Sequence, residues 1–122
     1  MSTVPPPKRK MSEMISEMAA NFISFGRTPQ EKEARLTAAC SAWNMACISP
    51  KLRYEQLGQY VEGYRRFNPA ISADDLACVR KDMESLIERK LQMFPGDLRQ
   101  IVGAKVVMIG KDYRIEVASG NI

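Results

Sequence analysis

The chain has 122 residues and no histidine, the side chain that most often serves as a general base and as a metal ligand. Catalytic triads that depend on histidine are therefore excluded. Zinc binding is disfavoured as well, because Cys40, Cys47 and Cys78 include no closely spaced pair that would help to complete a four-ligand site. We expect no catalytic site, no metal site and no cofactor, and we predict that the protein is not an enzyme.

Long apolar runs are also missing, since no stretch approaches the roughly 18 residues that a membrane-spanning helix needs. The basic residues near the N-terminus are not followed by the apolar segment of a secretory signal. An odd number of cysteines, three, without an export signal is typical of reduced thiols. We expect a cytoplasmic protein that does not enter a membrane. The glycines are scattered, so the sequence contains no glycine-rich phosphate loop.

Hydrophobic residues make up 45% of the chain and charged residues 26%, which is the composition of a folded soluble domain. The opening "MSTVPPPKRK" differs from the remainder, because its prolines prevent helix formation and its last three residues are basic. We therefore predict a disordered basic tail over residues 1–10 and a single helical domain over residues 11–122.

Four amphipathic segments are bounded by recognisable helix signals. Thr28 and Glu31 have the spacing of a capping box around Pro29, which suits the first helical position. Ser49 and Ser72 are further candidate N-caps. The apolar period and these boundaries predict helices over about 11–25, 29–48, 50–67 and 73–94.

Two features of these helices lead to specific expectations. Gly58 and Gly63 interrupt the third helix, where each costs about 1 kcal/mol relative to alanine, and we expect them to admit a closely packed neighbour. Lys90 interrupts the apolar stripe of the fourth helix. We expect its methylene chain to cover apolar surface while its ammonium group stays in water.

The stretch "KVVMIGKDYRIEV" changes to a period of two and predicts a β-hairpin with strands over about 104–109 and 112–118. A two-residue type II′ turn at Gly110 and Lys111 sets the register. That register gives one apolar face and one mixed face. The apolar face pairs Met108 with Tyr113, Val106 with Ile115 and Ala104 with Val117, and the mixed face pairs Lys105 with Glu116 and Val107 with Arg114.

A two-stranded hairpin is marginally stable alone, so its apolar face needs a cover. Either the hairpin packs on its own helices, or it pairs with the hairpin of a second chain across a two-fold axis to form a four-stranded sheet. The predicted fold class is mainly α (α+β): a four-helix, mostly antiparallel bundle closed by a C-terminal two-stranded β-hairpin.

These features favour a small non-catalytic protein-interaction or adaptor module that binds a protein partner or itself, as a homodimer formed through the hairpin. Unpaired strand edges are templates for strand addition. Methionines on the first helix are a second candidate surface, although packing into the chain's own core is the alternative explanation for them. The candidate interaction residues are Met11, Met14, Met18, Val107, Arg114 and Glu116.

The alternative function is a nucleic-acid-binding regulator. The helix over 50–67 interleaves tyrosines with arginines, a combination that can stack on bases and neutralise phosphates. Glu55 and Glu62 reduce the positive charge of that helix, and the tyrosines also follow a core-like period. The candidate nucleic-acid contacts are Lys8, Arg9, Lys10, Arg65 and Arg66.

Overall fold

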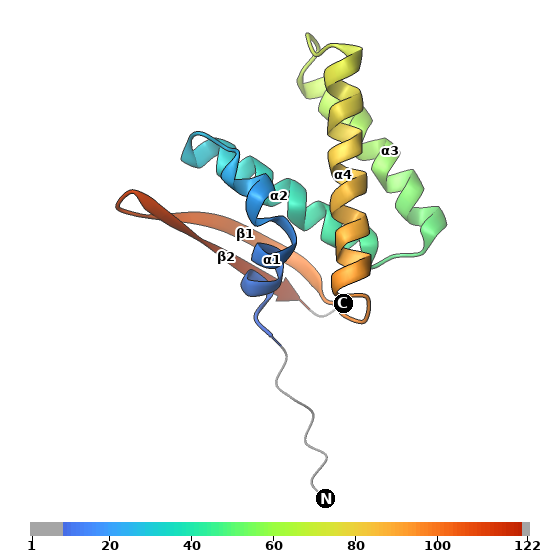
Figure 1. Cartoon of the computed structure of the whole chain (residues 1–122). Helices are drawn as coiled ribbons and strands as arrows, with labels where there is room; N and C mark the ends of the chain where they lie inside the picture. The colour runs from blue at the N-terminus through green and yellow to red at the C-terminus, as the bar shows by residue number, and fades with distance from the viewer. Residues whose placement is uncertain (1–8, 121–122) are drawn as a thin grey trace, which may run out of the picture.

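A computed structural model describes residues 9–120 and confirms the predicted fold class, four helices followed by an antiparallel β-hairpin (Figure 1). Within these residues, no helix is both long enough and apolar enough to cross a membrane. The elements are α1 (Met11–Ser24), α2 (Pro29–Ala46), α3 (Pro50–Phe67), α4 (Ala73–Met93), β1 (Gln100–Ile109) and β2 (Asp112–Gly120).

The predicted N-caps are confirmed. The Thr28 hydroxyl accepts a hydrogen bond from the Glu31 N–H at 3.1 Å, and the Glu31 carboxylate accepts one from the Thr28 N–H at 3.1 Å. The hydroxyls of Ser49 and Ser72 each accept from the N–H three residues further on. Such caps contribute about 1 kcal/mol each, which explains why α2, α3 and α4 begin where the sequence predicts.

The buried side chains form one contiguous cluster that draws on all four helices and on β1. Trp43 of α2 is completely buried and packs against Phe94 just beyond α4, with ring centroids 5.8 Å apart. Ile15 and Leu36 are also completely buried. The core therefore lies mainly between α1, α2 and the C-terminal part of α4.

The helices α3 and α4 run side by side away from the hairpin (Figure 1). Of the apolar residues of α3, Leu57 is buried, Tyr60 and Val61 are partly buried against the core, and Phe67 is 89% exposed. The reason is that the far end of α3 has only α4 beside it. The expectation for Gly58 and Gly63 was also wrong, because a Cβ atom at either position would meet no atom within 4 Å.

The expectation for Lys90 was also wrong, because its side chain is completely buried and its ammonium group does not reach water. The Nζ atom donates to the carbonyl oxygens of Phe94 at 2.8 Å and Asp97 at 2.5 Å, and lies 4.8 Å from the Trp43 ring centroid. The last carbonyls of a helix lack intrahelical partners. Lys90 supplies the missing donor and joins the end of α4 to the loop that follows.

The connection from α4 to β1 is held against α2 by polar contacts. The Trp43 indole N–H donates to the carbonyl of Arg99 at 2.8 Å. The Asn44 amide donates to the carbonyl of Ile101 at 2.9 Å and accepts from the Ile101 N–H at 2.8 Å. A hydrogen-bonded ion pair between Arg99 and Asp97, 2.5 Å long, lowers the pKa of the Asp97 carboxyl. These contacts fix the position of the hairpin relative to the helices.

Candidate functional site

The hairpin has the predicted turn and register. Gly110 takes a φ of +62°, whereas Lys111 does not have a positive φ, and this combination defines a type II′ turn. Every cross-strand pair expected from the sequence is present. The strands are longer than predicted, because pairing continues to Gln100 and Gly120, and a β-bulge interrupts the register between Ile101 and Gly103.

The apolar face of the hairpin lies on the chain's own helices, with β1 against α2 and β2 against α1 (Figure 1). Val106, Ile115 and Val117 are partly buried there against the core. Met108, next to the turn, remains 44% exposed because the hairpin tip extends beyond the helices. A second hairpin is therefore not needed to cover the apolar face, and the surface that remains is the outer face with its edges.

The outer face of the hairpin is charged. Glu116 lies 3.4 Å from the Lys105 ammonium group across the strands and accepts a hydrogen bond from Arg114 at 3.0 Å. The bond from Arg114 is the main cause of a lowered pKa at Glu116, and Lys105 acts in the same direction. Val107 is half-buried opposite Arg114. Because these charged groups reach solvent, their ion pairs contribute little to stability. They give the outer face of the hairpin a pattern of positive and negative side chains.

The two edges of the hairpin differ. At the edge of β1, Asn44 hydrogen-bonds the backbone of Ile101 as a neighbouring strand would, and the bulge follows at once. The edge of β2 has no such cover among the described residues. An antiparallel ladder alternates between hydrogen-bonded and non-hydrogen-bonded pairs, starting from the hydrogen-bonded pair that flanks the turn. The N–H and C=O groups of Tyr113, Ile115 and Val117 therefore point away from β1.

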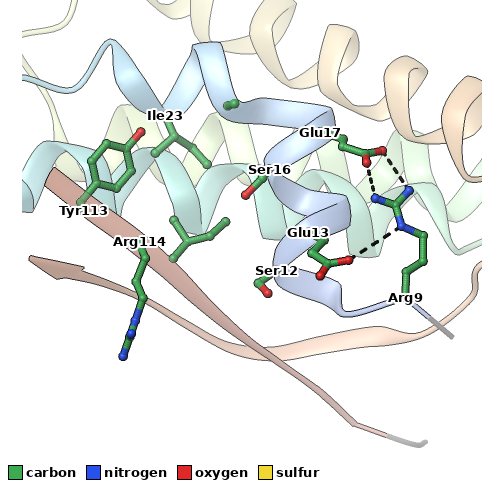
Figure 2. A pocket seen from close by; sticks show the side chains of 10 residues that line it. Arg9, Ser12, Glu13, Ser16, Glu17, Ile23, Tyr113 and Arg114 are labelled. Atoms are coloured by element: carbon green, nitrogen blue, oxygen red, sulfur yellow. Dashed lines mark hydrogen bonds and ion pairs between the residues drawn. The ribbon is translucent and has the colours of Figure 1, made fainter. Parts of the chain in front are cut away.

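A groove of about 560 Å³ runs between α1 and β2, beside this open edge (Figure 2). Its α1 wall contains three small side chains spaced by four residues, Ser12, Ser16 and Ala20, together with Glu13, Glu17 and Ile23. Tyr113 points toward α1, whereas Arg114 points away from it (Figure 2). The groove was not predicted, because the row of small residues next to the methionine stripe does not by itself indicate a neighbouring strand.

Arg9 occupies one end of the groove (Figure 2). Its guanidinium group forms two hydrogen bonds with the Glu17 carboxylate, one of them 3.1 Å long, and lies 3.9 Å from Glu13. The bonds from Arg9 lower the pKa of Glu17. This candidate nucleic-acid contact is therefore already paired with acidic side chains of α1.

The candidate methionines are not available as a binding surface. Met11 is 4% exposed, Met14 is 3% exposed and Met18 is 2% exposed, because all three lie in the core cluster. The alternative, packing into the chain's own core, is what the structure shows. The apolar face of α1 is needed to cover the core, and α1 contributes mainly small and charged side chains to the groove.

The other candidate nucleic-acid contacts do not form one basic surface. Arg65 and Arg66 both pair with Glu62, the latter at 3.7 Å. They lie at the end of α3, at the opposite end of the molecule from Lys10, which is exposed and directly precedes α1 (Figure 1). Lys8 lies outside the described residues.

No group of three or more cysteine, aspartate or glutamate side chains that could hold a metal ion is present in residues 9–120. Cys40, Cys47 and Cys78 are free thiols. Burial raises the pKa of Cys40 to about 12 and also raises the pKa of Cys47. Because the thiolate is the reactive form, these two side chains are poor nucleophiles at neutral pH.

Comparisons with protein-family models, with curated proteins and with solved structures found no match for this chain. The site must therefore be judged from its own geometry, in which the open edge of β2 lies beside the groove.

Proposed function

We propose that this protein is a small non-catalytic protein-interaction module that self-associates through the open edge of β2. The observation that supports this proposal is the row of outward-pointing backbone groups at Tyr113, Ile115 and Val117, which no described residue covers. A strand that lies along this edge would satisfy those groups, and strand addition is a common mode of protein recognition.

The groove beside the edge supports the same function. An added strand needs room for the side chains that it directs toward the helical layer. The groove between α1 and β2 provides that room, because Ser12, Ser16 and Ala20 occupy little volume. We also propose a cytoplasmic location, which the free thiols of Cys40 and Cys47 support.

The experiment combines sedimentation with amide hydrogen exchange followed by NMR at low and high protein concentration. The mass should double as concentration rises. Exchange at Tyr113, Ile115 and Val117 should slow over the same range, because their N–H groups become hydrogen-bonded between chains. The amides of Arg114 and Glu116 are internal controls, since they already pair with β1 and should be protected at both concentrations.

Two outcomes would contradict the proposal. A chain that stays monomeric up to about 1 mM, where an association energy of only about 4 kcal/mol is detectable, does not self-associate in a useful range. A dimer in which exchange at these three amides does not change must use another surface, and the role of β2 is then wrong.

A further inference from the structure

We infer that two copies of the chain pair β2 with β2 in one antiparallel register, with Ile115 opposite Ile115 of the second copy. This inference rests on the proposed function and adds the register and the side chains that select it. In this register Arg114 lies opposite Glu116 of the second copy, and Tyr113 lies opposite Val117 of the second copy.

The pleat of β2 limits the possible registers. Odd-numbered residues from Tyr113 to Val117 face the helices, and even-numbered residues such as Arg114 and Glu116 face outward. Directly opposed residues in an antiparallel pair project from the same face of the sheet. An odd-numbered residue must therefore oppose an odd-numbered one. The outward-pointing backbone groups belong to these same odd-numbered residues, so their hydrogen bonds require the same parity.

Charge separates the registers that remain. Centring the pair on Arg114 opposes the two Arg114 side chains and also places Asp112 opposite Glu116. Centring it on Glu116 opposes the two Glu116 side chains. Like charges directly opposite one another destabilise a sheet, whereas opposite charges contribute about 0.2–1 kcal/mol per pair.

The remaining registers are less favourable for other reasons. A pair centred on Tyr113 gains contacts between Arg114 and Asp112, but it uses only the end of the strand next to the turn. A pair centred on Val117 opposes Glu116 to Ala118 and gains no charge pair. Centring on Ile115 overlaps residues 112–118 of both chains and gives two opposite-charge pairs related by the two-fold axis. The order of positive and negative side chains along β2 is thus complementary to the same order in β2 of a second copy.

The helix-facing side chains agree with this register. Tyr113, Ile115 and Val117 of the second copy would continue the apolar face of the sheet beyond β2. They would enter the groove beside α1, next to Ser16 and Ala20. The result is a dimer with one four-stranded sheet and one helical layer, in which the β2 strand of each chain covers the β2 edge of the other.

The test uses the charge-reversing variants Arg114→Glu and Glu116→Arg. Each variant alone puts like charges opposite one another twice per dimer, so its dimer should be about 10- to 100-fold weaker than that of the natural chain. An equimolar mixture of the two restores opposite charges at both pairs. Native mass spectrometry should therefore find mainly heterodimer in the mixture, and high salt should reduce the preference.

The matched control is Lys105→Glu. This substitution makes the same change in charge as Arg114→Glu, lies on the same face and removes the other ion-pair partner of Glu116. Because it lies on β1, away from the second copy, it should change the dimer affinity by less than about threefold.

The outcomes separate the register from the function. If the natural chain dimerises with slowed exchange at Ile115, but the two variants dimerise as well alone as when mixed, the register is wrong and the proposed function stands. If Lys105→Glu weakens the dimer as much as Arg114→Glu, the effect is one of net charge and the register is again wrong. If the natural chain stays monomeric, both the function and the register are wrong.

Discussion

Replacing Asn44 by leucine should destabilise the protein strongly, because this side chain joins α2 to the first strand. Its amide group makes two hydrogen bonds with the backbone of Ile101, at 2.8 and 2.9 Å. Leucine has nearly the same shape but neither donor nor acceptor. Asn44→Leu therefore leaves the N–H and C=O of Ile101 without partners while still keeping water away from them.

The magnitude follows from these two groups. Each polar group left unpaired out of water costs about 1–3 kcal/mol. Burying the leucine offsets about 1 kcal/mol of this loss. We expect a net loss of about 2–4 kcal/mol in the free energy of unfolding, a large share of the roughly 5–15 kcal/mol available to a domain.

The isosteric variant Asn44→Asp is the informative comparison. Its carboxylate still accepts from the Ile101 N–H but faces the Ile101 carbonyl, so folding should raise the pKa of the new carboxyl. Protonation restores an O–H donor in place of the lost amide donor. Because the raised pKa makes the folded state bind the proton more readily, the stability lost in Asn44→Asp should be recovered as pH falls from 7 toward about 5. The loss in Asn44→Leu should not depend on pH.

Urea unfolding followed by fluorescence provides the measurement. Trp43 is the only tryptophan and its indole hydrogen-bonds the same connection, so its emission reports on this region directly. A change of less than about 0.5 kcal/mol in Asn44→Leu, the ordinary range of a surface substitution, would show that the hairpin is held mainly by apolar packing. A loss in Asn44→Asp that does not depend on pH would refute the hydrogen-bond geometry.

Three further predictions concern local features of the fold. Gly58→Ala should stabilise the protein by about 0.5–1 kcal/mol in urea unfolding, because the position is helical and a Cβ atom there meets nothing within 4 Å; a destabilised variant would show that α3 is packed more tightly than described. Gly110→Ala should lower the free energy of unfolding by about 1–2 kcal/mol in the same assay, because alanine is strained at a φ of +62°. An unchanged free energy of unfolding would argue against the type II′ turn. The pKa of Asp97 is lowered, chiefly by the hydrogen bond from Arg99, so its contribution to stability is present above its ordinary value of 3.8 and is lost as pH falls through the lowered value. Asp97→Asn should therefore be less stable than the natural chain at neutral pH, and calorimetry should find that the difference narrows in acid; a difference that stays constant would contradict this assignment.

Local features were the most predictable part of the structure. Caps and the turn depend on neighbouring residues, which is why Thr28, Ser72 and Gly110 could be assigned from the sequence. The register of the hairpin followed from its turn, together with the faces on which Arg114 and Glu116 project.

Features that depend on distant contacts were missed. Lys90 has the pattern of a solvated residue, but a buried acceptor set forms only when the loop after α4 folds back beneath Trp43. The exposure of Phe67 depends on how far α3 extends past α1 and α2, which its apolar period does not encode. The groove beside β2 required the positions of two elements that are distant in sequence. For that reason its small residues, such as Ser16, carried no recognisable signal.

The proposed self-association depends on how the two edges of the hairpin are protected. Charged side chains near an edge ordinarily discourage pairing with other strands. On β2, however, Arg114 and Glu116 have opposite signs and lie at equal distances on either side of Ile115. The charges therefore disfavour a strand that lacks the pattern and favour a second copy of the same strand. Because the bulge and Asn44 interrupt the edge of β1, pairing at β2 should produce a closed dimer of four strands and not a growing fibre.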